Sequence, residues 1–264
     1  MGKLRMQEEE ILEQCKHLLE KVGTILEKGF YEANKALEYK DKACTDYLTR
    51  YDKEVNHFLK EELRKNFPNY SIITEEEEAL LQESEYSFYV DPLDGTKNFA
   101  KGIPIFMTGI SLAKNEEVIL SITHQPITKD FFWAIKGKGA YHNGKRVSVS
   151  EENNLEKVDL DMCFSSGNKK LGSELVASLH SKACARSLHC AHYGQANVAR
   201  GACDVFVSKN AKPWDYCHYL LVLEAGGKVT DFQGKDFDLS KKELLCTNAK
   251  VHAKVLELIQ TRQQ

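Results

Sequence analysis

The stretch that decides the fold is Asp91-Pro92-Leu93-Asp94-Gly95-Thr96, which directly follows the β-prone run Ser87-Phe88-Tyr89-Val90. Pro92 fixes φ and removes an amide donor, and Gly95 permits backbone angles that other residues avoid. Both aspartates can therefore point into one space at the end of a strand. The alternative is an ordinary polar turn, because proline, aspartate and glycine dominate turns. The choice depends on which other acids the chain brings to this place.

Two further segments carry acids that fit the same place. Glu75 and Glu76 follow the predicted strand over 70–73, and Glu75 is the nearer to its end. The alternative for this pair is a solvated acidic run. Asp215 stands immediately before a predicted helix, where aspartate is also a preferred N-cap. Each acid taken alone therefore has an ordinary structural explanation.

If Glu75, Asp91, Asp94 and Asp215 meet, their charges need compensation. Two like charges about 4 Å apart repel by roughly 4 kcal/mol at an effective dielectric constant of about 20. Protonation or divalent cations must then balance them. All-oxygen ligands favour Mg²⁺ or Mn²⁺ over zinc, and backbone amides at Gly95-Thr96 can hold an anion. Hard cations beside such an anion site suit phosphoryl hydrolysis.

The composition is that of an ordinary soluble globular protein. The 264 residues include 36 Lys and Arg against 39 Asp and Glu, giving a net charge of −3, and this balance argues against a dedicated nucleic-acid surface. No segment approaches the roughly 20 apolar residues that span a bilayer, so we expect no membrane partner. The eight cysteines form no CxxC pair, and residues 1–10 lack a signal-peptide core. A cytoplasmic location is therefore expected.

Hydrophobic periodicity predicts helices before strands in the first half of the chain. Apolar residues at three- and four-residue steps predict helices over 11–26 and 52–66, with a mobile polar loop over 35–49 between them. The pair Asn143-Gly144 predicts a tight hairpin. After the first helices come β-prone runs at 70–73 and 87–90, and the runs at 105–114, 118–124 and 131–135 then follow at close spacing, as in an antiparallel meander.

The second half alternates between strands and helices. We predict strands at 158–165, 187–190 and 204–207, and helices at 171–181, 195–200, 215–225 and 255–259. The whole pattern predicts an α/β (α+β) protein of two closely packed lobes. Residues 1–150 would form an N-terminal α+β lobe with the first acidic motifs, and residues 151–264 a C-terminal α/β lobe that contributes Asp215 and substrate contacts.

The acidic motifs resemble those of the inositol monophosphatase family. Residues 91–99, Asp-Pro-Leu-Asp-Gly-Thr-Lys-Asn-Phe, are similar to its first signature, and Trp214-Asp215 with the downstream 223–227, Leu-Glu-Ala-Gly-Gly, to its second. Asp52 matches the family's helix-start aspartate, and Glu75-Glu76 its acidic pair. The matches occur in family order over most of the chain. The resemblance implies a layered αβαβα sandwich of the inositol monophosphatase and fructose-1,6-bisphosphatase type.

The resemblance also implies a metal centre. Glu75, Asp91 and the Leu93 carbonyl would bind a first Mg²⁺, and Asp91, Asp94 and Asp215 a second, so that Asp91 bridges the two. Some family members bind a third, weaker metal near Glu75. Two or three Mg²⁺ per site are therefore expected, with Mn²⁺ as a substitute.

Catalytic and substrate contacts follow from the same resemblance. Asp52 and Thr96 would form a hydrogen-bonded dyad that orients the attacking water, and Glu75 completes the catalytic set. The amides of Gly95 and Thr96 would hold phosphate oxygens. The implied substrate-binding residues are Gly95, Thr96, Cys190, Ala191, Ser208 and Asp215.

The resemblance implies the activity of a Mg²⁺-dependent, lithium-sensitive phosphoric monoester hydrolase. It also implies that the protein is a homodimer. Inositol 1-monophosphate is the foremost candidate substrate. Ser208, however, stands seven residues before Asp215, where many inositol phosphatases carry a glutamate that contacts sugar hydroxyls. This difference leaves open a fructose-1,6-bisphosphatase, a 3′(2′),5′-bisphosphate nucleotidase or a histidinol-phosphatase. A non-enzymatic alternative is a binding partner in a transcription or RNA-processing complex.

Overall fold

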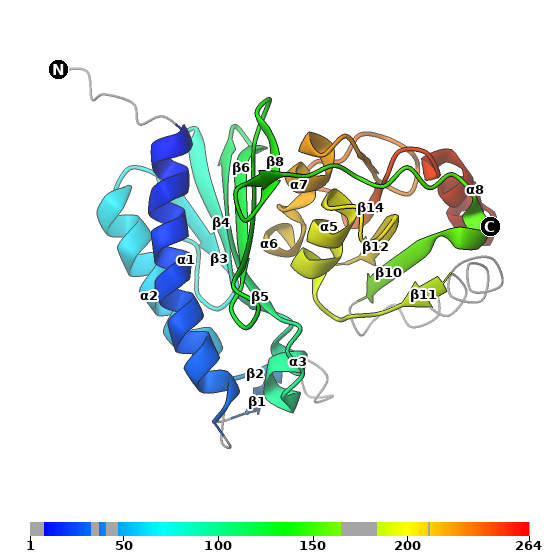
Figure 1. Ribbon diagram of the computed structural model, residues 1–264. Coiled ribbons are helices and arrows are strands. Elements are labelled where there is room, and N and C mark those ends of the chain that lie inside the picture. The colour runs from blue at the N-terminus through cyan, green and yellow to red at the C-terminus, as the bar shows by residue number, and fades with distance from the viewer. Residues whose placement is uncertain (1–7, 33–36, 41–46, 165–183, 211, 264) are drawn as a thin grey trace.

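The computed structural model describes residues 8–32, 37–40, 47–164, 184–210 and 212–263, and its elements stack in five layers (Figure 1). Two helices cover one face of a seven-stranded sheet, and shorter helices lie between that sheet and a five-stranded one. A final helix covers the outer face of the second sheet. This order confirms the predicted αβαβα sandwich.

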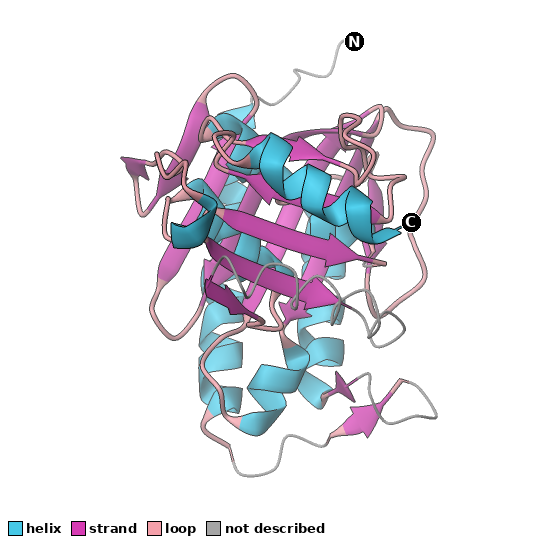
Figure 2. Cartoon of the chain, turned by 90° about the vertical axis from the view of Figure 1, so that its right-hand side faces the viewer, coloured by secondary structure: helices cyan, strands magenta, loops and turns pink. Residues whose placement is uncertain are grey.

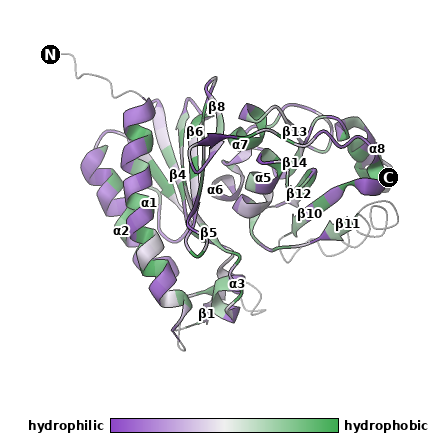
Figure 3. Ribbon diagram, viewed as in Figure 1, coloured by the Kyte–Doolittle hydropathy of each residue, from purple (hydrophilic) through white to green (hydrophobic). Residues whose placement is uncertain are grey.

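Helices α1 (Glu8–Phe30) and α2 (Arg50–Asn66) form the first layer. Apolar residues recur every three or four positions in each helix, so each has one stripe that can be buried. Leu19 of α1 and Leu59 of α2 are fully buried against the first sheet, while hydrophilic residues lie along the outer surfaces of the helices (Figure 3). This packing fixes the start of α2, which carries Asp52, over the end of the sheet.

The seven-stranded sheet brings the first acidic motifs together. Its order is β3-β4-β5-β6-β7-β8-β9, with β3 and β4 parallel and the other pairs antiparallel, which confirms the predicted meander. In the β3–β4 pair Thr74 is opposite Val90, so Glu75 and Asp91 follow at the same edge. The strands are β3 (Ser71–Thr74), β4 (Tyr86–Asp94), β5 (Met107–Lys114), β6 (Glu117–Gln125), β7 (Asp130–Ile135), β8 (Gly139–His142) and β9 (Lys145–Arg146).

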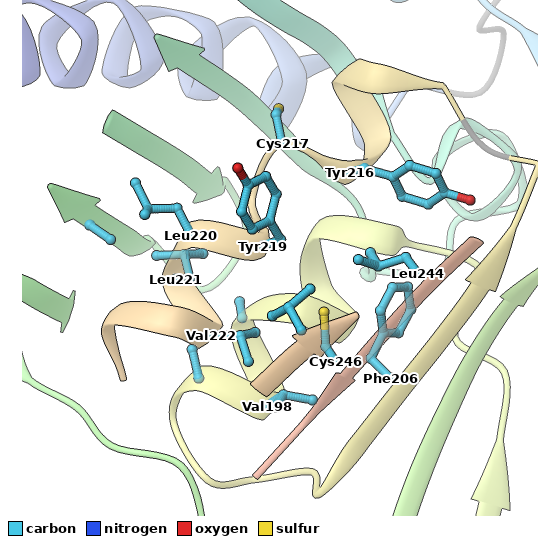
Figure 4. Close-up of a cluster of buried hydrophobic side chains, with 14 of the residues drawn as sticks. Val198, Phe206, Tyr216, Cys217, Tyr219, Leu220, Leu221, Val222, Leu244 and Cys246 are labelled. Atoms are coloured by element: carbon cyan, nitrogen blue, oxygen red, sulfur yellow. The ribbon is translucent and has the colours of Figure 1, made fainter. Parts of the chain in front are cut away.

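The middle layer joins the two sheets through one continuous hydrophobic core. It contains α5 (Ala191–Ala199), α6 (Pro213–Tyr216) and α7 (Tyr219–Glu224). Leu220 and Val222 of α7 pack in the same cluster as Phe206 and Leu244 of the second sheet (Figure 4). The cluster also includes residues of the first sheet such as Phe132. The helices of this layer therefore hold the two sheets in a fixed relation.

The five-stranded sheet and the last helix complete the fold. The sheet order is β11-β10-β12-β14-β13, and α8 (His252–Gln263) lies across its outer face (Figure 2). β10 is parallel to β11 and β12, whereas β14 is antiparallel to β12 and β13. The strands are β10 (Asp159–Phe164), β11 (Cys184–Arg186), β12 (Val205–Lys209), β13 (Lys228–Thr230) and β14 (Glu243–Thr247).

The chain passes from one sheet to the other between Arg146 and Asp159, through a short 3-10 turn at Leu155–Lys157. All strands of the first sheet therefore precede residue 150, and all strands of the second follow it. The division into lobes of 1–150 and 151–264 stays a prediction. Within the part of the chain that the structure describes, no helix has the length and apolar character needed to cross a membrane.

Several predicted elements differ from the structure. The segment predicted as a loop over 35–49 contains the short antiparallel pair β1 (Glu38–Tyr39) and β2 (Tyr47–Leu48). The helix predicted over 215–225 is two helices, because Pro213 begins α6 early and the backbone turns at Cys217-His218. Short elements without strong periodicity were not predicted, namely α3 (Thr96–Lys101), β13 and β14.

The predicted strand over 187–190 is wrong in position, since β11 ends at Arg186. His189 adopts φ 52°, which turns the chain, and α5 then begins at Ala191 and not at residue 195. The predicted helix over 171–181 lies outside the described residues.

Candidate active site

The end of β4 is shaped to present two aspartates. The register between β4 and β5 shifts between Asp91 and Asp94, so the strand bulges over the Pro92-Leu93 step. The amide of Leu93 donates to Asp91 Oδ1 at 3.0 Å and fixes that carboxylate. Gly95 has φ 87°, and a Cβ there would lie 2.9 Å from the carbonyl oxygen of Ile105. Only glycine fits this turn without strain.

Three carboxylates converge between the end of β4 and the start of α6. Ligand oxygens of Asp91, Asp94 and Asp215 all lie within 4.8 Å of one another. Asp91 is 1% exposed and Asp94 8%. Burial, followed by the negative charge of Glu75, raises the pKa of both Asp91 and Asp215 well above the usual value. Such a cluster favours a bound cation, and its all-oxygen donor set fits a hard divalent ion such as Mg²⁺ or Mn²⁺.

Asp94 is held by the first turn of α5. The backbone amides of Ala191 and His192 donate to its Oδ1 and Oδ2 at 3.1 and 2.6 Å. The Cys190 thiol donates to Oδ2 at 3.0 Å. Cys190 and Ala191, which the family resemblance assigns to substrate, thus contact a metal-ligand candidate directly. Their contact with substrate stays a prediction.

Asp215 is positioned by its own helix start. Its Oδ2 accepts a hydrogen bond of 2.5 Å from the backbone amide of Lys212, the N-cap residue of α6. It is the third residue of α6 and not the N-cap, so the simple N-cap alternative is wrong. The same carboxylate caps the helix and joins the acidic cluster.

Asp52, which is fully buried, and the half-buried Thr96 form a hydrogen-bonded pair. The Thr96 hydroxyl lies 2.9 Å from Asp52 Oδ1 and 2.9 Å from the Leu93 carbonyl oxygen. Asp52 Oδ2 accepts hydrogen bonds of 2.6 Å from both the amide and the hydroxyl of Thr49. Burial raises the pKa of Asp52 to about 6, although the Thr49 and Thr96 hydrogen bonds act in the opposite direction.

Glu75 lies at the sheet edge beside this cluster but outside the compact group of three. Its Oε1 accepts a hydrogen bond of 2.7 Å from the Lys40 ammonium, which also binds Glu76. Burial, followed by the charge of Glu75, raises the pKa of Glu76 to about 7. Lys40 therefore lies where a cation near Glu75 would also bind. No pattern in the sequence singled it out.

Ser208 lies on β12 and is fully buried. Its hydroxyl donates to the Cys163 carbonyl oxygen on the neighbouring strand at 2.6 Å. Its assignment as a substrate contact stays a prediction, and so does the phosphate-binding role of the Gly95 and Thr96 amides. Thr49 was missed as part of the site, although the spacing Thr49-x-x-Asp52 is a capping signal that can be read from the sequence.

Known proteins are similar to this chain in both sequence and fold. The sequence profile of the inositol monophosphatase family matches residues 7–264. A Thermotoga maritima protein named fructose-1,6-bisphosphatase/inositol-1-monophosphatase is 31% identical over 251 residues, which are 92% of this chain and 93% of that protein. A Pasteurella multocida protein named Nus factor SuhB is 32% identical over 246 residues, covering 91% and 92% of the two chains.

A solved structure agrees with these relatives. The Thermotoga maritima IMPase matches with a TM-score of 0.87 and 30% identity, over 96% of this chain and 97% of that one. The acidic cluster, the αβαβα layers and the sequence match over nearly the whole length all lead to the same assignment. The chain belongs to the inositol monophosphatase family.

Proposed function

We propose that this protein is a Mg²⁺-dependent phosphomonoesterase acting on a small polyol or sugar phosphate. Membership of the inositol monophosphatase family supports a phosphatase. The observation that carries the proposal is the convergence of Asp91 and Asp94, from β4 of the first sheet, with Asp215, from α6 of the middle layer. Carboxylates this close together repel one another when no cation is bound, and burial together with the charges of Glu75 and Asp94 raises the pKa values of both Asp91 and Asp215.

The metal ligands are proposed in two overlapping sets. Glu75, Asp91 and the Leu93 carbonyl would hold one Mg²⁺, and Asp91, Asp94 and Asp215 a second, with Mn²⁺ as a substitute. A third ion near Glu75 would have to displace Lys40. When bound, such ions lower the pKa of water and neutralise charge on phosphate oxygens.

The Asp52–Thr96 pair would orient the attacking water. A threonine hydroxyl has one proton, and both of its neighbours here, Asp52 Oδ1 and the Leu93 carbonyl, are acceptors. The proton is therefore directed inward, and an oxygen lone pair of Thr96 is left to accept a hydrogen bond from water. Asp52, held in place by Thr49, would take up the proton that Thr96 passes on when water is deprotonated. Glu75 would support this catalytic set through its charge.

The substrate would bind between the start of α3 and the first turn of α5. We propose that the Gly95 and Thr96 amides hold phosphate oxygens, and that the surroundings of Cys190, Ala191 and Asp215 contact the polyol. Ser208 would contact the substrate only if its hydroxyl were released from the Cys163 carbonyl oxygen, to which it donates a hydrogen bond.

Inositol 1-phosphate is the foremost proposed substrate. Because position 208 is a serine and not the glutamate of many inositol phosphatases, larger or doubly phosphorylated substrates should be tested as well. Phosphate release should be measured with Mg²⁺ on inositol 1-phosphate, fructose 1,6-bisphosphate, 3′-phosphoadenosine 5′-phosphate and histidinol phosphate. The proposal expects Mg²⁺-dependent turnover of at least one of them. A panel with no turnover above the chelator control would contradict it. We further expect inhibition by millimolar Li⁺, through the second metal set.

A second candidate function is that of a binding partner in a transcription or RNA-processing complex. It is favoured by the 32% identity to the protein named Nus factor SuhB. The two functions separate in an Asp91→Asn variant, which would lose phosphate release but keep partner binding. A homodimer and a cytoplasmic location remain part of the proposal.

A further inference from the structure

A pair of buried histidines lies directly beneath the acidic cluster. His192 comes from the first turn of α5, and His218 from the turn between α6 and α7. Both are fully buried, and their rings pack edge to face with centroids 4.0 Å apart. Neither belongs to the proposed metal ligands, and the proposed mechanism does not use them.

The ring of His192 touches all three segments that carry the clustered aspartates. Its Nε2 lies 3.1 Å from the Trp214 carbonyl oxygen, which immediately precedes Asp215, and 3.5 Å from Asp91 Oδ2. Its Nδ1 lies 3.9 Å from Asp94 Oδ2. The backbone amide of the same residue donates to Asp94 Oδ2 at 2.6 Å.

The hydrogen-bond partners place a proton on Nε2 of His192, whose Nδ1 lies 3.4 Å from the Thr123 hydroxyl. A carbonyl oxygen can only accept, so the contact with Trp214 requires an N–H at Nε2. That N–H donates to the Trp214 carbonyl oxygen, and Nε2 lies 3.5 Å from Asp91 Oδ2. It therefore ties α6 of the second half of the chain to β4 of the first.

Gly109 makes room for this arrangement. It is opposite Asp91 in the β4–β5 ladder. A Cβ on Gly109 would lie 2.7 Å from Cε1 of His192 and 2.2 Å from Nε2 of His218. A side chain at this position would push both rings away from the sheet, and the His192 ring away from its present contacts.

We propose that His192 is a positioning residue that sets the spacing of Asp91, Asp94 and Asp215, and thereby the affinity of the site for a divalent cation. The inference rests on the proposed metal-binding function. His192 would act as a hydrogen-bond donor that orients the metal-binding carboxylates, which is the usual role of residues behind a metal site.

The test is calorimetric titration of the chelator-treated full chain with Mn²⁺. His192→Leu removes the donor while keeping an apolar side chain of similar size, and it should weaken Mn²⁺ binding about tenfold or more, the usual cost of losing such a group. His192→Gln carries an amide nitrogen at about the reach of Nε2 and should bind nearly as tightly as the unaltered chain. His192→Asn carries the same amide group on a shorter side chain, which does not reach the position of Nε2, and its Mn²⁺ binding should be weakened as in His192→Leu. Gly109→Ala, which leaves His192 itself intact, should also weaken binding.

His252→Gln is the matched control. His252 is buried and bonded to Thr230 and Thr247 far from the acids, so its loss lowers stability without touching the site. Thermal unfolding of each variant shows whether it is folded. If His192→Leu does not fold, the comparison of Mn²⁺ affinity between His192→Gln and His192→Asn tests the inference. Equal Mn²⁺ affinity of Gln and Asn variants, or an unchanged affinity of a folded Leu variant, would overturn the inference. Failure of the unaltered chain to bind Mn²⁺ would instead overturn the proposed function, and the inference with it.

Discussion

Thr96 and Asp52 are 44 positions apart in the chain, and their side chains are joined by a hydrogen bond of 2.9 Å between Oγ1 and Oδ1. The bond connects the start of α3 to the start of α2, at the edge where β3 and β4 end. Asp52 serves at once as the acid of a helix cap and as the partner of Thr96. A structural and a catalytic explanation of the same residue are therefore compatible.

Removing the Thr96 hydroxyl should slow catalysis more than it affects metal binding. Thr96→Val keeps the shape of the side chain but leaves Asp52 Oδ1 and the Leu93 carbonyl without their donor. We expect kcat to fall on the order of 100-fold, the typical share of a positioned proton-transfer group. Mn²⁺ affinity, measured by calorimetry, should change little. Thr96→Ser restores the hydroxyl and should restore most of the rate; a Val variant as active as the Ser variant would remove Thr96 from the mechanism.

Removing the Lys40 ammonium should strengthen cation binding near Glu75. The Lys40 Nζ lies 2.7 Å from Glu75 Oε1. Burial acts to lower the pKa of Lys40, but the charges and hydrogen bonds of Glu75 and Glu76 together raise it, so the ammonium stays cationic and competes with a metal. Lys40→Met keeps the apolar part of the side chain and removes its charge. The Mg²⁺ concentration that half-saturates the weakest site should then fall several-fold; a tenfold fall would correspond to about 1.4 kcal/mol of binding free energy. Lys136→Met, which breaks an exposed pair with Glu117, is the matched control. Weaker Mg²⁺ binding in the Lys40 variant would show that the ammonium supports the site and does not compete.

Asp161 should make the protein less stable as the pH rises from about 4 to 6. Burial raises the pKa of this carboxyl to about 6, despite hydrogen bonds from the Met162 and Leu188 amides. The folded pKa lies above the unfolded value, so the stabilisation is present at low pH and is lost as the pH passes through about 6. The rise in the pKa of Asp161 from 3.8 to about 6 corresponds to a loss of at most about 3 kcal/mol in the free energy of unfolding.

Asp161→Asn therefore should flatten the pH dependence and raise the free energy of unfolding at pH 7. Urea unfolding at pH 4 and pH 7, with Mg²⁺ held constant, measures this. The same change at the more exposed Asp159 of that strand controls for the loss of one negative charge. An Asp161→Asn variant with the pH dependence of the unaltered chain would contradict the argument.

The acids of the first half could be predicted because their position depends on local rules. A β-prone run followed by Asp91-Pro92-Leu93-Asp94-Gly95 predicts a strand that ends in a turn, and the parallel β3–β4 pair then sets Glu75 beside Asp91. The helices α1 and α2 and the meander were also accessible, since their helical and strand periodicities were strong, whereas the order of the five layers was implied by the family resemblance.

Other parts of the site depend on tertiary packing that leaves no local pattern. Lys40 lies in a polar stretch with no periodicity, and only the folded chain brings it to Glu75 and Glu76. The break between α6 and α7 places His218 against Gly109, and a continuous apolar run in the sequence predicts one helix instead. The contact of His192 with Asp91 and Trp214 likewise joins residues from three elements.

The most direct test of the central claim is phosphate release from inositol 1-phosphate by the unaltered protein and by Asp91→Asn, each with Mg²⁺ and with a chelator. Asp91 is the acid shared by both proposed metal sets, and asparagine keeps its shape without its charge. We predict Mg²⁺-dependent release by the unaltered protein, abolished by the chelator, and a loss of at least about 1,000-fold in the folded variant, equivalent to roughly 4 kcal/mol. Release that persists with the chelator, or that survives in Asp91→Asn, would contradict the account.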